Sequence, residues 1–212
     1  MDIAEKQTCL GEHMGKIFYL MGKSSSGKDT IYKHILTENK FKLRKIVPYT
    51  TRPIREGEED GREYFFIDDA EVRKLADEGR IIELRAYKTY HGNWKYMTVN
   101  DGRINLKKHN YLIIGTLESY KKTVEYYGQE AVVPILVEVD NGVRLQRALN
   151  RERNQAEPKY QEMCRRFLAD EEDFRQELID EANIPRIFVN ETLDVCIAEI
   201  EDYIKENLEP IE

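Results

Sequence analysis

The stretch from Phe18 to Thr30, with the sequence FYLMGKSSSGKDT, constrains the fold of this chain more than any other segment. A short apolar run there ends in a loop of glycines and serines, and apolar residues at helical spacing follow from Asp29 to Glu38. This order is typical of a phosphate-binding loop between a strand and a helix, in which backbone N–H groups converge on phosphate oxygens. The alternative is a flexible Gly/Ser turn that joins the two elements.

The loop departs from the usual pattern at one position. Lys28 places a positive charge beside the outer phosphates, but the next residue, normally Ser or Thr, is Asp29. A carboxylate and a phosphate repel each other unless a divalent metal lies between them, so we expect Asp29 to bind Mg2+ directly or through water. Alternatively, Asp29 only favours the positive end of the helix dipole. The expected phosphate-binding set is Gly22, Ser24, Ser25, Ser26, Gly27, Lys28, Asp29 and Thr30.

Composition narrows the classes of partner. The 212 residues carry a net charge of -7, which argues against non-specific nucleic-acid binding, so any polyanionic ligand must be held by local clusters of arginine and lysine. Cys9, Cys164 and Cys196 are isolated, as in a reducing compartment. No apolar run approaches the ~18 residues that span a bilayer, and the N-terminus lacks a signal pattern. We therefore expect a cytoplasmic monomer or homodimer with no membrane or nucleic-acid partner.

A second charged segment follows, from Thr50 to Phe66. Arg52 and Arg55 are three residues apart, threonine hydroxyls precede them and Tyr64 follows, and these are the groups that a phosphate monoester needs. By composition alone, a run of alternating charges with two glycines is typical of a solvated connection. Further on, Glu83 is the one acid in an apolar strand-like run, where it could also face solvent.

The second half alternates strands and helices, which favours a parallel sheet. Five arginines bracket the polar segment 152–159 and suggest a mobile lid, although an ordinary charged helix hairpin is the alternative: Arg147, Arg151, Arg153, Arg165 and Arg166. We expect a long acidic helix from about Tyr160 to Ala182, with its 170–173 acidic run in solvent, and a polar helix from Asp101 to His109.

Taken in order, these segments resemble the guanylate kinase family of P-loop nucleoside monophosphate kinases over Lys16 to Leu208, most strongly at TTRPIREGEEDGREYFF. The resemblance implies that Arg52, Arg55 and Tyr64 hold the phosphate of GMP. It also implies that Glu83 accepts hydrogen bonds from the guanine N1–H and 2-amino group, two donors that a carboxylate suits. Arg147, Arg151 and Arg166 match lid arginines of the family, and Asn190 matches an asparagine near the adenine of ATP.

The resemblance further implies a three-layer α/β/α fold with a five-stranded parallel sheet, a small mixed lobe and a helical lid. We expect an extension at 1–15, a core at 16–48 and 110–212, a lid at about 150–166 and a GMP-binding lobe at 49–109. The implied reaction is direct in-line transfer from Mg2+-ATP to GMP, which gives GDP. The residues expected to act in catalysis are Lys28, Arg52, Arg147, Arg151 and Arg166.

Three departures from the family keep other readings open. Pro48 replaces a usual serine, the segment 89–96 has no clean counterpart of a Tyr-Gly-Ser element, and the strand 112–116 lacks its acids. Thr116 would then be a neutral hydrogen-bonding group for the base of GMP. One alternative is a kinase for another small acceptor such as ribose 1,5-bisphosphate, since those enzymes carry Gly-Lys-Asp in the loop. Another is a catalytically inactive, guanylate-kinase-like binding module.

Overall fold

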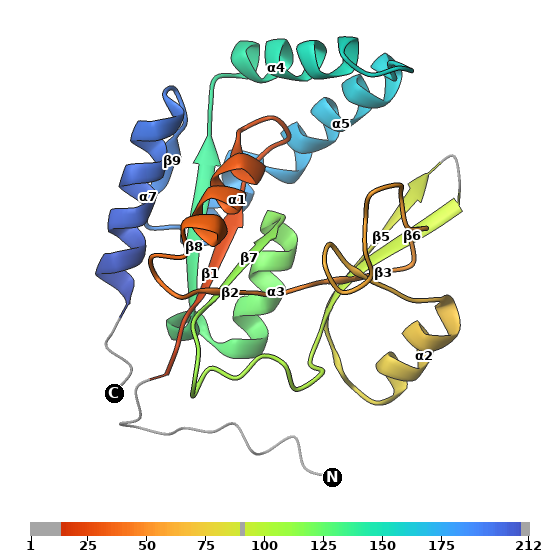
Figure 1. Ribbon diagram of the computed structural model, residues 1–212, viewed down its shortest axis with the longest axis vertical. Coiled ribbons are helices and arrows are strands. Elements are labelled where there is room, and N and C mark those ends of the chain that lie inside the picture. The colour runs from red at the N-terminus through yellow and green to blue at the C-terminus, as the bar shows by residue number, and fades with distance from the viewer. Residues whose placement is uncertain (1–13, 90–91, 209–212) are drawn as a thin grey trace.

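The computed structural model describes residues 14–89 and 92–208, which form two sheets with their helices (Figure 1). The larger sheet has five parallel strands in the order β2-β7-β1-β8-β9, as predicted. These strands are β1 (Ile17–Met21), β2 (Arg44–Lys45), β7 (Tyr111–Gly115), β8 (Val132–Glu138) and β9 (Ile187–Val189). The expected N-terminal extension lies outside the described residues, apart from residues 14 and 15.

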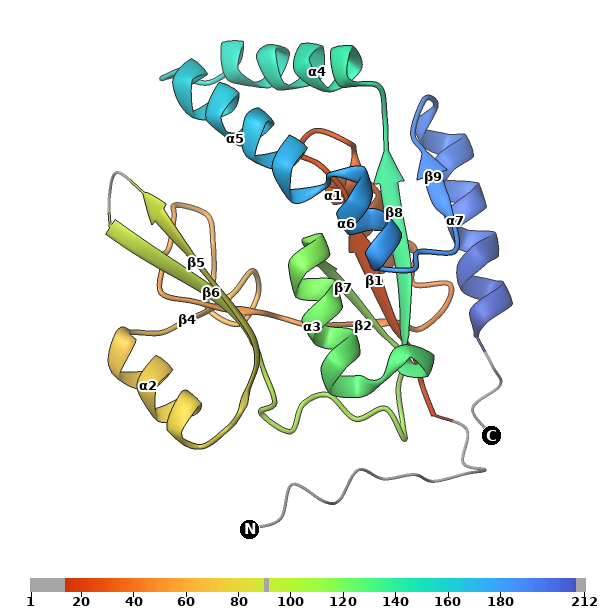
Figure 2. The same cartoon turned by 180° about the vertical axis from the view of Figure 1, so that it is seen from behind.

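Helices cover both faces of this sheet and make three layers (Figures 1 and 2). The helices α1 (Lys28–Glu38) and α7 (Leu193–Asn207) lie on one face, where Phe18 and Leu20 pack. The helices α3 (Leu117–Tyr127) and α6 (Gln176–Glu181) lie on the other, with Tyr19. Because successive strand residues point to opposite faces, the central strand β1 is apolar throughout and fully buried.

The parallel sheet brings the carboxyl ends of its strands to one edge. There β1 leads into the loop 22–27, β7 leads into Thr116, and β9 leads into Asn190. The strand β8, which follows a short 3-10 turn (Gln129–Ala131), leads into α4 (Asn141–Arg153). Segments far apart in the sequence therefore meet at this edge, and that meeting creates the candidate site.

The second sheet forms a small lobe beside the core (Figure 1). Its order is β4-β3-β6-β5, and its hairpin of β5 and β6 is its longest part. Asp68 caps the adjoining helix by accepting a hydrogen bond from the Glu71 N–H at 2.8 Å. The elements of the lobe are β3 (Tyr49–Thr50), β4 (Phe65–Phe66), α2 (Asp69–Asp77), β5 (Ile81–Thr89) and β6 (Gly92–Val99).

The helix predicted over Asp101 to His109 is wrong, because that segment is irregular with a single turn. Gly102 has a φ of +81°, outside the helical region. The side chains of Asp101 and Asn105 accept hydrogen bonds from backbone N–H groups two residues later, at 2.9 and 3.0 Å. Such local bonds compete with helix formation.

The long helix predicted from Tyr160 to Ala182 is interrupted. It forms α5 (Tyr160–Asp173) and the short α6, with a break at Phe174 and an extended backbone at Arg175. The break lets Phe174 and Ile179 pack into the core on the α3 side of the sheet. Together α4 and α5 project beyond the carboxyl edge of the sheet (Figure 1). None of the helices in the described part of the chain has the length and apolar character needed to cross a lipid bilayer.

The packing of α7 predicts a position-dependent loss of stability. Ile200 is 0% exposed on this helix, so we expect Ile200→Ala to lower the free energy of unfolding by about 2–5 kcal/mol. Val195→Ala is the matched control, since Val195 is 57% exposed on the same helix, and its effect should stay below about 0.5 kcal/mol. Urea unfolding of both variants measures this, and equal effects would contradict the packing described.

Candidate functional site

The loop 22–27 lies in close contact with the sheet edge, and two glycines permit it. A Cβ on Gly22 would lie 2.3 Å from the Val137 carbonyl oxygen, and one on Gly27 would lie 2.2 Å from Asn190 Nδ2. Gly27 also has a φ of +95°, which favours glycine. No other residue type fits at either position while the loop keeps this path.

Three buried polar atoms around the loop have no hydrogen-bond partner. Among the described residues, Ser25 Oγ, Ser26 Oγ and Asn190 Oδ1 are the buried side-chain atoms left unsatisfied. The other side of the Asn190 amide is engaged, because its Nδ2 donates to the Ser26 carbonyl at 2.7 Å. Buried polar groups are nearly always paired, so their convergence at one loop indicates a site for a polar ligand.

The start of α1 supplies positive charge to the same place. Gly27 is its N-cap and forms no side-chain cap, so the first N–H groups and the helix dipole favour an anion. Lys28 Nζ lies 3.5 Å from the Lys23 carbonyl oxygen and 3.6 Å from the Asp29 carboxylate. Arg147 extends toward the loop from α4, with its two terminal nitrogens 3.5 Å from the Ser26 carbonyl oxygen and 3.4 Å from that of Asn190. The cradle therefore fits phosphate groups.

Asp29 would be the main protein ligand of a metal ion at this site. The part of the chain that the structure describes contains no group of three His, Cys, Asp or Glu side chains that could hold a metal ion. The side chain of Asp29 is 76% exposed at the mouth of the loop, and Thr30 is also exposed. Mg2+ is commonly bound by one or two carboxylates together with substrate phosphates and waters, and this arrangement fits that mode.

An ion cluster that sequence reasoning missed links the loop to α4 and α5. Arg144, only 1% exposed, donates to the Ser24 carbonyl at 3.1 Å, to Glu171 at 2.7 Å and to Asp170 at 3.1 Å. Asp170 also accepts the Ser24 N–H at 2.8 Å, and Glu171 accepts from Lys23 at 2.9 Å. The prediction that 170–173 is a solvated face is therefore wrong for its first two residues, which are ordered by the arginine.

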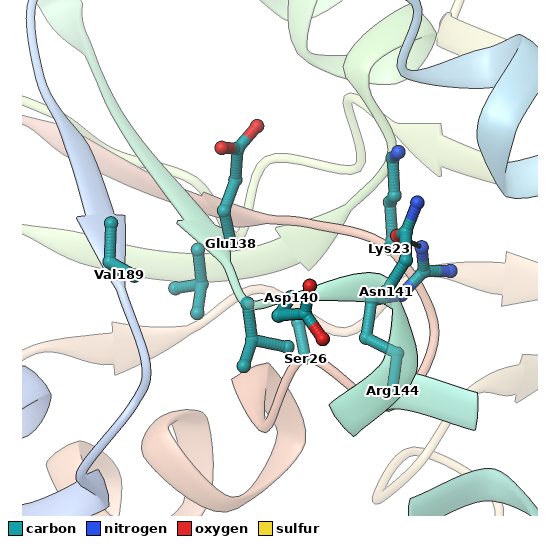
Figure 3. A pocket seen from close by; sticks show the side chains of 9 residues that line it. Lys23, Ser26, Glu138, Asp140, Asn141, Arg144 and Val189 are labelled. Carbon is teal, nitrogen blue, oxygen red and sulfur yellow. Dashed lines mark hydrogen bonds between the residues drawn. The ribbon is translucent and has the colours of Figure 1, made fainter. Parts of the chain in front are cut away.

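Two members of the cluster, Lys23 and Arg144, line a pocket of about 340 Å³ beside the loop (Figure 3). Burial raises the pKa of Glu171, but hydrogen bonds from Lys23 and Arg144 outweigh it and leave the pKa below its ordinary value. Glu171 therefore stays ionised at neutral pH. The pocket is lined by Lys23, Ser26, Val137, Glu138, Val139, Asp140, Asn141, Arg144 and Val189.

On the lobe, Arg52 is held by the carboxylate of Glu58, a residue that the sequence analysis did not single out. Its two terminal nitrogens each lie 2.8 Å from an oxygen of Glu58, and its guanidinium lies 5.1 Å from the ring centre of Tyr64. The hydrogen bond from Arg52 lowers the pKa of Glu58. Arg55 is exposed, with its N–H donating to Glu58 at 2.8 Å. The structure thus brings the predicted phosphate-binding arginines and tyrosine of the lobe into one region.

The hairpin of the lobe carries the predicted base-reading acid. Glu83 is buried rather than solvent-facing, and across the hairpin Thr98 donates to it at 2.9 Å. Tyr96, two residues before Thr98, packs edge-on against Tyr64 with ring centres 5.7 Å apart. The sequence showed no clean counterpart of the Tyr-Gly-Ser element within 89–96, because the hairpin register that brings Thr98 opposite Glu83 cannot be read from spacing.

Thr116 and Arg85 connect this hairpin to the core. Thr116 caps α3 in a capping box with Ser119. Its hydroxyl also accepts a hydrogen bond from Arg85 at 3.3 Å. Arg85, which sequence reasoning did not single out, pairs with Glu83 at 3.0 Å. Burial lowers the pKa of Arg85, but the charge of Glu83, the neighbouring tyrosines and the hydrogen bond to Glu83 together raise it more, so the guanidinium stays charged.

The remaining predicted lid residues lie apart from the loop. Arg151 and Arg166 are exposed on α4 and α5, and within the described ranges neither donates a hydrogen bond to the loop. Of the predicted lid arginines, Arg147 alone reaches it in this structure.

Comparison with known proteins gives one consistent result. A family model described as Guanylate kinase matches residues 14–207. The guanylate kinase of Anaplasma phagocytophilum (strain HZ) is 39% identical over 70 residues, which are 33% of this chain and 33% of that protein. That of Mycoplasma pneumoniae (strain ATCC 29342 / M129 / Subtype 1) is 37% identical over 82 residues, 38% of this chain and 34% of that protein. The matches thus span about a third of the length of these relatives.

A solved structure shows the same fold over nearly the whole chain. The crystal structure of guanylate kinase from Anaplasma phagocytophilum superposes with a TM-score of 0.60, covering 94% of this chain and 90% of that one. The sequence identity of that pair is 24%, so this likeness concerns the fold.

Breaking the ion cluster should destabilise the protein. Arg144→Met leaves Asp170 and Glu171 without their arginine, and we expect a loss of about 3 kcal/mol, the low end for a broken buried pair because both acids are partly exposed. Arg165→Met, which breaks the exposed Arg165–Glu162 pair on α5, should lose less than about 1 kcal/mol. Urea unfolding measures both, and equal losses would show that the cluster does not order the loop.

The Arg52–Glu58 pair predicts a pH dependence of stability. Because the folded-state pKa of Glu58 is lowered from 4.5, the pair stabilises the fold above that pH, and the contribution is lost as pH falls through the folded pKa. The difference in unfolding free energy between wild type and Glu58→Gln should therefore be constant from pH 7 to about 5 and shrink below about 4.5. Glu56→Gln, in the same loop, is the control. A difference that stays flat in acid would refute the pairing.

Proposed function

This chain belongs to the guanylate kinase family, and from that premise we propose that it transfers the terminal phosphate of ATP to GMP, producing ADP and GDP. The observation that carries the proposal is the cradle of unsatisfied polar atoms at the loop 22–27, beside a lobe that holds an arginine and a buried carboxylate. A donor site and an acceptor site are what transfer between two nucleotides requires.

The loop would bind the donor. The hydroxyls of Ser25 and Ser26 and the first backbone N–H groups of α1 would offer hydrogen bonds to the phosphates of ATP. Lys28 would neutralise the charge that builds up on the transferred group. Mg2+, held by Asp29 and the phosphates, would supply further charge neutralisation. The other residues expected to contact ATP are Ser24, Thr30 and Asn190.

The lobe would bind the acceptor. Arg52, Arg55 and Tyr64 would hold the phosphate of GMP, and for this Arg52 must exchange its pair with Glu58 for the phosphate. Glu83 would accept from the guanine N1–H and 2-amino group, and Thr116 would face the base. Adenine lacks those two donors and would forgo both hydrogen bonds to Glu83, which disfavours AMP.

The projecting α4 and α5 would close over both nucleotides. Closure would bring Arg151 and Arg166 to the phosphates, alongside Arg147, and would exclude water that otherwise hydrolyses ATP. The acceptor phosphate is already ionised, so little acid–base chemistry is needed, and alignment and charge neutralisation supply the catalysis.

A comparison of acceptors tests the proposal. With Mg2+-ATP present, we expect ADP release to be stimulated by GMP and not by AMP, UMP, ribose 1,5-bisphosphate or buffer alone, because of the base-reading carboxylate. Stimulation by ribose 1,5-bisphosphate alone would indicate a different acceptor. ATP binding without any stimulated turnover would indicate an inactive binding module.

The division between donor and acceptor sites predicts two distinct defects. Lys28→Ala should lower kcat roughly 100- to 1,000-fold, as expected for a group that stabilises the transition state. Arg52→Ala should raise the KM for GMP roughly tenfold or more while ATP affinity is unchanged, since it removes a charged hydrogen-bond donor from the acceptor.

Arg62→Ala, in the same lobe segment but exposed, is the matched control and should behave as wild type. Equal losses of ATP affinity in the Lys28 and Arg52 variants would contradict the two-site division. Steady-state kinetics with each nucleotide varied in turn supplies both parameters.

A further inference from the structure

The acid proposed to read the guanine base is covered by an arginine from its own strand. The side chain of Glu83 is 1% exposed, and that of Arg85 is 13% exposed. Arg85 Nε lies 3.0 Å from one Glu83 oxygen, and its NH2 group lies 3.4 Å from the other. Because residues two apart on a strand face the same side, the two side chains share one surface of the hairpin.

The hydrogen-bond capacity of Glu83 shows what a base must displace. A carboxylate has about four acceptor positions. Thr98 and the two nitrogens of Arg85 occupy three, and the guanine edge brings two more donors. Both guanine donors fit if the NH2 group of Arg85 gives up its long 3.4 Å contact with Glu83 while Nε keeps its 3.0 Å contact. The NH2 group of Arg85 is then free to donate elsewhere.

The remaining anchors keep the guanidinium in place during that exchange. Its NH1 donates to Thr116 Oγ1 at 3.3 Å, at the N-cap of α3. The guanidinium is thus held at one side by the core and at the other by the lobe, so a small rotation frees one donor without moving the side chain into solvent. Removing the charge altogether would leave Glu83 buried without a counter-charge, which is strongly unfavourable.

We propose that Arg85 is a specificity-determining residue that donates to O6 of the guanine of GMP while Glu83 accepts from N1–H and the 2-amino group. Along its edge guanine presents two donors followed by the O6 acceptor, and a carboxylate beside a guanidinium is complementary to that order. Adenine carries an amino group at position 6, so two hydrogen-bond donors, this group and the guanidinium of Arg85, would face each other without an acceptor. The inference rests on the proposed phosphorylation of GMP.

Base analogues separate the two contacts. 6-Thio-GMP keeps N1–H and the 2-amino group but replaces O6 with a weak acceptor, and IMP keeps O6 but lacks the 2-amino group. In wild type we expect kcat/KM for 6-thio-GMP to fall roughly tenfold below that for GMP, the effect of one hydrogen bond to a charged donor. In Arg85→Met this ratio should shrink to within about twofold, while the GMP-to-IMP ratio stays as in wild type.

Two further variants keep the test decisive. Arg80→Met removes an exposed arginine of the same lobe, paired with Glu78, and should preserve both ratios. If Arg85→Met does not fold, as judged by circular dichroism and ATP affinity, Arg85→Lys replaces it. Its single ammonium keeps a charge beside Glu83 but lacks the planar fork that bonds carboxylate and base together, so the same loss of discrimination is expected.

These experiments separate failure of the proposed role of Arg85 from failure of the proposed phosphorylation of GMP. An unchanged preference for GMP over 6-thio-GMP in the Arg85 variants, or better use of GMP than in wild type, would overturn the role of Arg85. Arg85 would then only cover Glu83. Absence of GDP formation by wild type would instead overturn the proposed function, and the inference with it.

Discussion

The structure depends on the close packing of the phosphate loop between β8 and Asn190. Gly22 approaches the backbone of Val137, and Gly27 approaches the side-chain amide of Asn190, both at distances that admit no Cβ. This packing fixes the loop from two strands of the parallel sheet and leaves three polar atoms turned toward it without partners. A loop positioned by the sheet edge pays its ordering entropy on folding, so a bound nucleotide does not have to order it.

Buried arginines paired with carboxylates form the second organising feature. Arg144 pairs with Asp170 and Glu171, Arg52 with Glu58, and Arg85 with Glu83. A chain with a net charge of -7 needs such local arrangements to bind polyanions. In each pair the carboxylate keeps the guanidinium ordered. In two of them, Arg52 and Arg85, we propose that a nucleotide takes over part of the pairing.

The sequence was sufficient for the parts of the molecule that follow from local patterns. The apolar run of β1 and the glycine loop each have a short-range signal, and the alternation of the second half predicts the parallel sheet. The sequence was insufficient where a side chain contacts a residue that is far away along the chain. Arg144 meets the acids of α5 across the space between two helices, and Thr98 meets Glu83 through a hairpin register that spacing does not reveal. The break at Phe174 likewise reflects tertiary packing, because the acidic sequence around it is helix-compatible.

The central claim is that one chain binds two nucleotides and moves a phosphate directly between them. The most direct measurement is anion-exchange chromatography of the protein mixed with Mg2+-ATP and GMP, with ADP and GDP quantified separately by absorbance and inorganic phosphate measured by a colorimetric assay. Direct transfer predicts that GDP and ADP appear in equal amounts, with no inorganic phosphate. ADP accompanied by inorganic phosphate and no GDP would contradict the account, since the phosphate would then pass to water.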